Sequence, residues 1–219
     1  MDAQSPTGAP DWVGRIRRRL AGSVPDHERA AWLLPGLTAQ QTALYRRYFP
    51  PHPVAAAVLI PVIARADPTV LLTQRSADLR HHAGQISFPG GRIEAGDAGP
   101  AAAALREARE EVGLEADFVE ISGYLPDHIT PSGFRITPVV GIVRPGFTLR
   151  LDSNEVAELF EVPLAHVFDP ARRRPRTRRF GPDESGEEAE VQLCDIPWEG
   201  RIIWGATAGM LITLQRECA

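Results

Sequence analysis

Residues 91–114 read GRIEAGDAGPAAAALREAREEVGL, a glycine-rich loop that runs directly into a helical segment rich in glutamate. On a helix, residues three and four apart share a face, so Glu107, Glu110 and Glu111 project together although like charges repel. A hard divalent cation such as Mg²⁺ offsets that repulsion, because it takes carboxylate oxygens together with phosphate oxygens of a substrate. The segment therefore predicts a metal site for a diphosphate.

An ordinary solvated helix face is the alternative reading of such a glutamate cluster. The loop before the helix argues against it, because Gly90 and Gly91 allow the backbone to approach a ligand closely, and loop amides and carbonyls can meet phosphate or metal. Pro100 suits the first helical position and Gly113 suits the helix stop. We therefore expect Gly90 and Gly91 to bind substrate beside a metal-binding helix.

The segment resembles the signature of the Nudix hydrolases, G-x5-E-x7-R-E-U-x-E-E-x-G-U, where U is a bulky aliphatic residue. The matching positions are Gly91, Arg106, Glu107, Glu110, Glu111, Gly113 and Leu114. Asp97 stands where glutamate is usual, and eight residues instead of seven separate it from Arg106. Ala108 is also small for a U position.

The sequence upstream narrows this resemblance to one branch of the family. The run LLTQRS at residues 71–76, then Arg80, Gly84 and FPGG at residues 88–91, is similar to the second motif of the coenzyme A diphosphatases. That branch also carries the aspartate and the extra residue. Further similarity lies downstream, so that the resemblance covers roughly residues 51–214.

The resemblance implies an α/β fold, an α/β/α sandwich with a mixed β-sheet, and a small-molecule substrate. The implied reaction is hydrolysis of the diphosphate of coenzyme A, or of its acyl or oxidised derivatives, to 3′,5′-ADP and (acyl-)4′-phosphopantetheine. Mg²⁺ or Mn²⁺ is the implied cofactor. Two alternatives stay open: a Nudix hydrolase of another nucleoside diphosphate derivative, such as ADP-ribose or a dinucleotide, and a non-catalytic nucleotide-binding module.

Roles follow for the residues of the signature helix. Glu107 and Glu111, one turn apart, are the expected direct metal ligands, and Glu110 is expected to bind a second ion. Arg106 is expected to orient a glutamate through a bidentate ion pair, with a plain surface arginine as the alternative. The general base is left open between Glu110 and Glu155. For Glu155 the alternative is a plain carboxylate at a helix start, with the preceding asparagine as cap.

Basic side chains outside the helix are candidates for the substrate phosphates. Arg75 and Arg80 precede the glycine loop and are expected to bind phosphate, including the 3′-phosphate of coenzyme A. Salt bridges from these arginines to the glutamate helix are the alternative. His128 is a candidate for a catalytic role, although a lone loop histidine more often faces solvent.

The strongest basic run spans residues 172–179, where six of eight residues are arginine. A Gly-Pro-Asp turn follows it, and then glutamates up to Glu190. We favour a hairpin with opposite charges across its strands, and phosphate binding by the run is the weaker alternative.

Composition indicates the number of domains, the kinds of partner and the state of the cysteines. The chain has 219 residues, 43% of them hydrophobic, with a net charge of −4 and a pI near 5.9. This suits one core and offers no general attraction for nucleic acid or anionic membrane. Cys194 and Cys218 are expected to be inert thiols, because two cysteines make no disulfide framework. No leader-like start or long apolar run is seen, so we expect a soluble cytoplasmic protein.

Periodicity places the secondary structure. We expect strands at residues 54–63, 70–75, 117–125 and 135–144, and a helix at residues 205–216, in a domain that spans residues 51–219. Residues 1–50 are expected to form a helical extension that caps the core, with the first ten residues disordered and helices at 11–20 and 39–48. A homodimer formed through these helices is a hypothesis.

Overall fold

The computed structural model describes residues 10–26, 43, 47–49, 51–78, 82–181, 186 and 188–218. Its elements in chain order are α1 (Trp12–Leu20), β1 (Val54–Ile63), β2 (Thr69–Arg75), β3 (Ile86–Ser87), β4 (Gly90–Arg92), α3 (Pro100–Val112), η1 (Ala116–Phe118), β5 (Val119–Tyr124), β6 (His128–Ile129), β7 (Phe134–Val143), β8 (Val156–Pro163), α4 (Leu164–Phe168), η2 (Pro170–Arg172), β9 (Arg174–Phe180), β10 (Ala189–Trp198), β11 (Arg201–Ile203) and α5 (Gly205–Cys218). The strands and the last helix expected from periodicity are confirmed, with ends shifted by no more than two residues.

A mixed sheet forms the centre of the fold. Within the described residues its main strand order is β3-β2-β1-β7-β5, while β4 pairs with β1, β6 with β7 and β8 with β2. β1 and β7 are parallel along ten residues, from the pair of Val54 with Phe134 to that of Ile63 with Val143, and the other pairs are antiparallel. β1 is rich in branched apolar residues and is buried on both faces over most of its length, as the sequence predicted.

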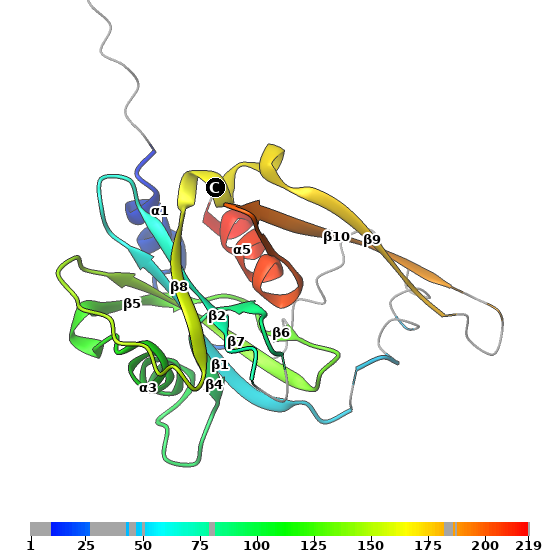
Figure 1. The fold of residues 1–219 in the computed structure, drawn as a ribbon, viewed down its shortest axis with the longest axis horizontal. Coiled ribbons are helices and arrows are strands. Elements are labelled where there is room, and N and C mark those ends of the chain that lie inside the picture. Colours follow the sequence, from blue (N-terminus) through cyan, green and yellow to red (C-terminus); the bar gives the residue numbers. More distant parts are fainter. Residues whose placement is uncertain are drawn as a thin grey trace, which may run out of the picture.

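Helices cover both faces of this sheet (Figure 1). The alanines of α3, among them Ala104 and Ala108, pack against Leu59 on one face. Alternate residues of β1, such as Ile60, face the other way into a cluster with Leu211 of α5. Because successive strand residues point to opposite faces, one apolar strand supplies both cores. The predicted α/β/α sandwich is confirmed.

The arginine-rich run forms β9, which pairs antiparallel with β10 beside α5 (Figure 1). Arg179 lies opposite Glu190 and its Nε is 3.3 Å from a carboxylate oxygen of that residue. Arg176 Nε lies 3.1 Å from Asp195 Oδ1. The predicted hairpin with opposite charges across its strands is therefore confirmed, with an aspartate as well as a glutamate on the second strand.

α1 packs on the core as predicted for the N-terminal cap. Ile16 and Leu20 are buried, and the rings of Trp12 and Phe168 meet edge to face at 4.9 Å. Residues 1–9, expected to be disordered, and most of the helix expected at 39–48 lie outside the described residues. Among the helices described, none has both the length and the apolar character needed to cross a membrane.

Candidate active site

Two glycines bring the backbone of β4 against its neighbours. A Cβ added at Gly90 would lie 2.4 Å from the carbonyl oxygen of Ala57, and one added at Gly91 would lie 2.3 Å from Glu107 Oε1. Real side chains do not approach this closely, so Gly90, which faces backbone atoms, requires glycine, whereas a Cβ at Gly91 would push the end of the Glu107 side chain aside. The Gly90 N–H donates to Glu111 Oε2 at 3.2 Å. The two glycines thus lie in close contact with the carboxylates of α3. Both glycines also line the adjoining cavity.

Arg106 organises the glutamate face of α3. Its Nε and Nη2 donate to the two carboxylate oxygens of Asp97, both at 3.1 Å. Its Nη1 donates to Glu107 at 2.9 Å and to Glu110 at 3.1 Å, and Nη2 also reaches the carbonyl oxygen of Arg92 at 3.1 Å. The expected bidentate pair is thus present, but its partner is Asp97 instead of a glutamate. Single hydrogen bonds hold the two glutamates.

Glu111 and Glu107 are carboxylates with little access to solvent. Glu111 is 4% exposed, and burial raises its pKa to about 7. The hydrogen bond from the Gly90 N–H and the charge of Arg75 lower this pKa but do not outweigh burial. Burial also raises the pKa of Glu107, while Arg106 opposes the shift. The side chain of Glu110 is 52% exposed, on the outer side of the cluster. The α3 face therefore combines a buried carboxylate, a partly buried one and an exposed one.

Glu155 completes the carboxylate cluster from a distant part of the chain. It lies in the turn before β8, lines the same cavity as Glu107 and Glu111, and its charge raises the pKa of both. The helix start suggested for Glu155 is wrong, because a strand follows it. Asn154 caps no helix; its backbone N–H and side-chain amide donate to Asp152 Oδ1, both at 2.9 Å.

The donor set fits a hard divalent cation. Within the described ranges, no three acidic, histidine or cysteine side chains lie close enough together to hold a metal by themselves. Mg²⁺ does not need such a cage, because one or two carboxylates plus waters and substrate phosphates complete its shell. Burial and the neighbouring carboxylates raise the pKa of Glu107 and Glu111 although Arg106 and Arg75 oppose the shift, and a bound cation would add further positive charge. Glu107 and Glu111, with Glu110 and Glu155 beside them, are the residues able to hold it.

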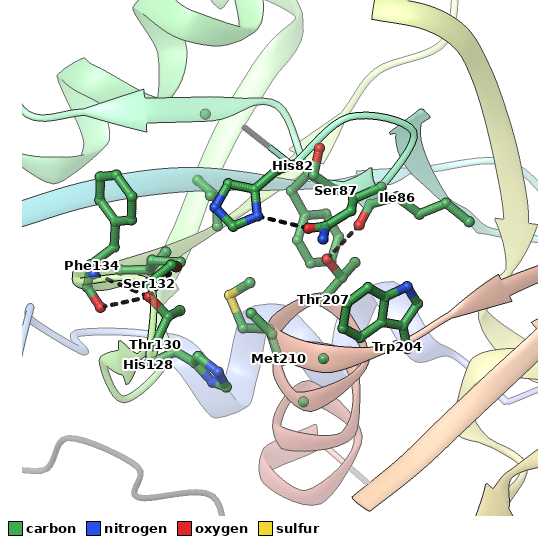
Figure 2. A pocket seen from close by; sticks show the side chains of 18 of the residues that line it. His82, Ile86, Ser87, His128, Thr130, Ser132, Phe134, Trp204, Thr207 and Met210 are labelled. Carbon is green, nitrogen blue, oxygen red and sulfur yellow. Dashed lines mark hydrogen bonds between the residues drawn. The ribbon is translucent and has the colours of Figure 1, made fainter. Parts of the chain in front are cut away.

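A cavity of about 630 Å³ opens next to these carboxylates, within the size range of small-molecule sites. Figure 2 shows its walls: His128, Thr130, Ser132 and Phe134 lie on one side, and Trp204, Thr207 and Met210 lie across the open space near α5. The Thr207 hydroxyl donates to the carbonyl oxygen of Ile86 at 2.9 Å, which fixes the start of α5 against β3. The lining is mostly apolar and includes the carboxylates of Glu107, Glu111 and Glu155.

His128 is not the solvent-facing loop residue that was expected. It lies in β6, opposite Ile136 of β7, and lines the cavity. Its Nδ1 is buried and has no hydrogen-bond partner among the residues described. Burial lowers the pKa of this imidazole to about 4, so the ring is neutral at physiological pH. A two-residue strand gives no periodic signal, which is why sequence reasoning left this position in a loop.

Arg75 lies beside the glutamate helix. Its Nη1 is 3.8 Å from Glu111 Oε1, which is the salt bridge considered as the alternative to phosphate binding. It also lines the cavity, and its Nε is buried without a partner in the described part of the chain. Arg80 lies outside the described residues. Substrate binding by both arginines stays a prediction.

Sequence reasoning missed part of the lining. Trp204 and Met210 come from around α5, and Arg216 is near the end of that helix, where a cation is an ordinary helix-terminal residue. Arg173 and Arg178 also line the cavity, although the hairpin reading of their run had made phosphate contact the weaker alternative. Nothing local in the sequence shows that these residues meet the glutamate helix around one cavity.

The chain is similar in sequence and in fold to known proteins. The family model described as NUDIX domain matches residues 52–193. The protein named uncharacterized Nudix hydrolase NudL from Citrobacter koseri is 45% identical over 157 residues, which cover 71% of this chain and 78% of that protein. The protein of the same name from Escherichia coli K12 is 45% identical over 159 residues, with the same coverage. Among solved structures, the MutT protein from Methanosarcina mazei Go1 aligns with a TM-score of 0.44 and 20% identity over 54% of this chain and 83% of that one.

Proposed function

The chain belongs to the Nudix hydrolases, a family that generally uses divalent metal cations, and from this premise we propose that its substrate is coenzyme A or an acylated or oxidised derivative. The proposed reaction is hydrolysis of the diphosphate bond to 3′,5′-ADP and (acyl-)4′-phosphopantetheine. The observation that carries the proposal is that Glu107 and Glu111 of α3 line a cavity of about 630 Å³ whose wall is mostly apolar and also includes basic side chains from the β9 and α5 regions.

The shape and chemistry of that cavity support a substrate with three different parts. Coenzyme A has a diphosphate, a flexible pantetheine arm of low polarity and a further phosphate on the ribose. Glu107 and Glu111 line the cavity, Met210 and Phe134 supply apolar walls, and Arg178 contributes positive charge. Further support comes from the branch-like motif at residues 71–91, which places Arg75 next to Glu111.

We assign the metal to the α3 face. Glu107 and Glu111 would hold Mg²⁺ or Mn²⁺, and Glu110 would contribute to a second ion. Such ions, when bound, neutralise charge on the phosphoryl oxygens and lower the pKa of the attacking water. Arg106 is a positioning residue, because its guanidinium is occupied by Asp97, Glu107 and Glu110 and does not line the cavity.

The remaining roles follow from which side chains line the cavity. Glu155 does so and lies near Glu107 and Glu111, whereas Glu110 is held by Arg106 on the outer side. We therefore favour Glu155 as the general base that accepts the proton of the attacking water. Gly90, Gly91 and Arg75 would bind the diphosphate, since Arg75 is within 3.8 Å of the carboxylate cluster. Arg80 keeps its predicted role in phosphate binding.

Product analysis tests the proposal. The purified protein is incubated with coenzyme A and Mg²⁺ or Mn²⁺, and nucleotides are separated by anion exchange beside a Glu111→Gln variant. We expect 3′,5′-ADP from the wild type and none from the variant. Turnover of ADP-ribose or a dinucleotide without turnover of coenzyme A would replace the substrate class and keep the hydrolase. Inactivity on all of them would favour a nucleotide-binding module.

A further inference from the structure

The arginines of residues 172–179 differ in whether they form ion pairs. Three make ion pairs: Arg172 with Asp169 at 3.4 Å, Arg176 with Asp195 at 3.1 Å, and Arg179 with Glu190 at 3.3 Å. Arg173 and Arg178 differ from these three, because they line the cavity and make no ion pair within the part of the chain that the structure describes. Two of the ion pairs therefore cross from β9 to β10, and the Arg172 pair lies within the η2 region. Arg174 makes no ion pair with a described residue and does not line this cavity, so Arg173 and Arg178 are the two arginines of the run that the cavity receives.

Arg216 of α5 joins these two cations. It lines the same cavity and makes no ion pair with any residue described. Arg173 Nη2 donates to Gln215 at 3.1 Å, next to Arg216, while Arg173 Nε is buried without a hydrogen-bond partner in the described chain. Burial lowers the pKa of Arg173, and the charge of Arg216 acts in the same direction. Arg178 and Arg216 are exposed, so the unpartnered donor that a bound anion would satisfy is the buried Nε of Arg173.

The geometry points to a second anion-binding subsite formed by Arg173, Arg178 and Arg216, which takes the 3′-phosphate of the substrate and leaves the diphosphate to Arg75 and Arg80. This inference rests on the proposed function, because the 3′-phosphate is the anionic group that coenzyme A carries apart from its diphosphate. Arginine suits the group, since its planar fork donates bidentately to phosphate oxygens. The Arg178 guanidinium carbon lies 4.9 Å from the centre of the Phe180 ring, a cation–π contact that helps to hold this side chain in place.

The subsite is separated from the carboxylate cluster along α5. Thr207 fixes the first turn of α5 against Ile86, and Arg216 lies about 14 Å further along the helix axis at 1.5 Å per residue. Arg75, in contrast, lies 3.8 Å from Glu111 and is placed for the diphosphate. Arg75 and Arg216 are thus two separate basic positions in the lining of one cavity, which matches a ligand with two separated anionic groups.

Nucleotide binding tests the subsite without any catalytic step. Calorimetry on the full-length protein compares 3′,5′-ADP with 5′-AMP, which differ only in the 3′-phosphate. We expect 3′,5′-ADP to bind about tenfold to a hundredfold more tightly, the range of a charge-assisted hydrogen bond to phosphate. Arg178→Ala should remove most of this ratio. Arg179→Ala is the matched control, because Arg179 is adjacent on the same strand, pairs with Glu190 and does not line the cavity.

Arg173→Ala provides a second variant, with thermal unfolding measured alongside because this side chain also bonds Gln215. Equal affinity of the wild type for the two nucleotides, or the same loss of the ratio in Arg179→Ala, would overturn the subsite. Kinetics separate this inference from the proposed function. If the wild type cleaves coenzyme A and dephospho-coenzyme A with equal KM, the proposed function stands and the subsite fails. If the wild type cleaves neither substrate, the proposed function fails. The ratio of the affinities for 3′,5′-ADP and 5′-AMP then decides by itself whether the subsite exists.

Discussion

Arg106 donates through Nε and Nη2 to both carboxylate oxygens of Asp97, each at 3.1 Å. Asp97 is itself tied to the loop, because its Oδ2 accepts the Glu94 N–H at 2.8 Å. Hydrogen bonds from Arg106 and from this N–H lower the pKa of Asp97, which keeps it ionised. The position where the sequence departs from the family signature is thus the anchor that directs the remaining guanidinium N–H groups to Glu107 and Glu110.

Substitution of Asp97 by asparagine should weaken the metal site without removing a ligand. The neutral amide cannot accept both donors of Arg106, so Glu107 and Glu110 lose a fixed partner. We expect metal affinity or turnover to fall about tenfold to a hundredfold, the usual cost of losing a group that orients a metal ligand. Metal titration of the hydrolysis rate measures this. Arg109→Ala on the same helix, an exposed residue without an ion pair in the described chain, should leave the titration unchanged.

Replacement of Gly91 by alanine should displace one carboxylate and leave the fold in place. The new Cβ would lie 2.3 Å from Glu107 Oε1, and the end of a glutamate side chain can move away without moving the backbone. We expect turnover to fall at least about tenfold, while the unfolding midpoint changes little. Gly96→Ala is the matched control, because a Cβ there meets nothing within 4 Å. Equal activity of the two variants would show that the position of Glu107 is unimportant.

The sequence was most informative where the structure is local. The apolar run of β1 and the carboxylate face of α3 are fixed by spacing within one segment, so their predictions hold. Glu155 reaches the same cavity only through the pairing of β8 with β2, and Arg216 only because α5 packs on the far face of the sheet. These contacts between residues far apart in the sequence depend on strand register and on the packing of helices on the sheet, which no local sequence pattern specifies.

Stability below neutral pH should report on His128. Its pKa is about 4 in the folded protein and about 6.5 in an unfolded chain, so the unfolded state binds more protons between these values. The stabilisation by the neutral ring is complete above pH about 6.5 and is lost as the pH falls towards 4, by up to about 3 kcal/mol. Other groups titrate in this window, so the measurement is the difference between wild type and His128→Gln in urea unfolding at several pH values. His52→Gln, at an exposed position, should retain the wild-type pH dependence.

The two cysteines should differ in reactivity, because they lie in different environments. Cys218 is 1% exposed and burial raises its pKa to about 11, so almost no thiolate forms at pH 8. Cys194 is partly exposed and lines the cavity, close enough to Arg173 for the charges to interact. We expect an aromatic disulfide reagent to titrate one thiol in the native protein and two in denaturant, with the native reaction lost in Cys194→Ser. Bound 3′,5′-ADP should slow the native reaction if the nucleotide occupies the arginine subsite, and an unchanged rate would place the nucleotide elsewhere.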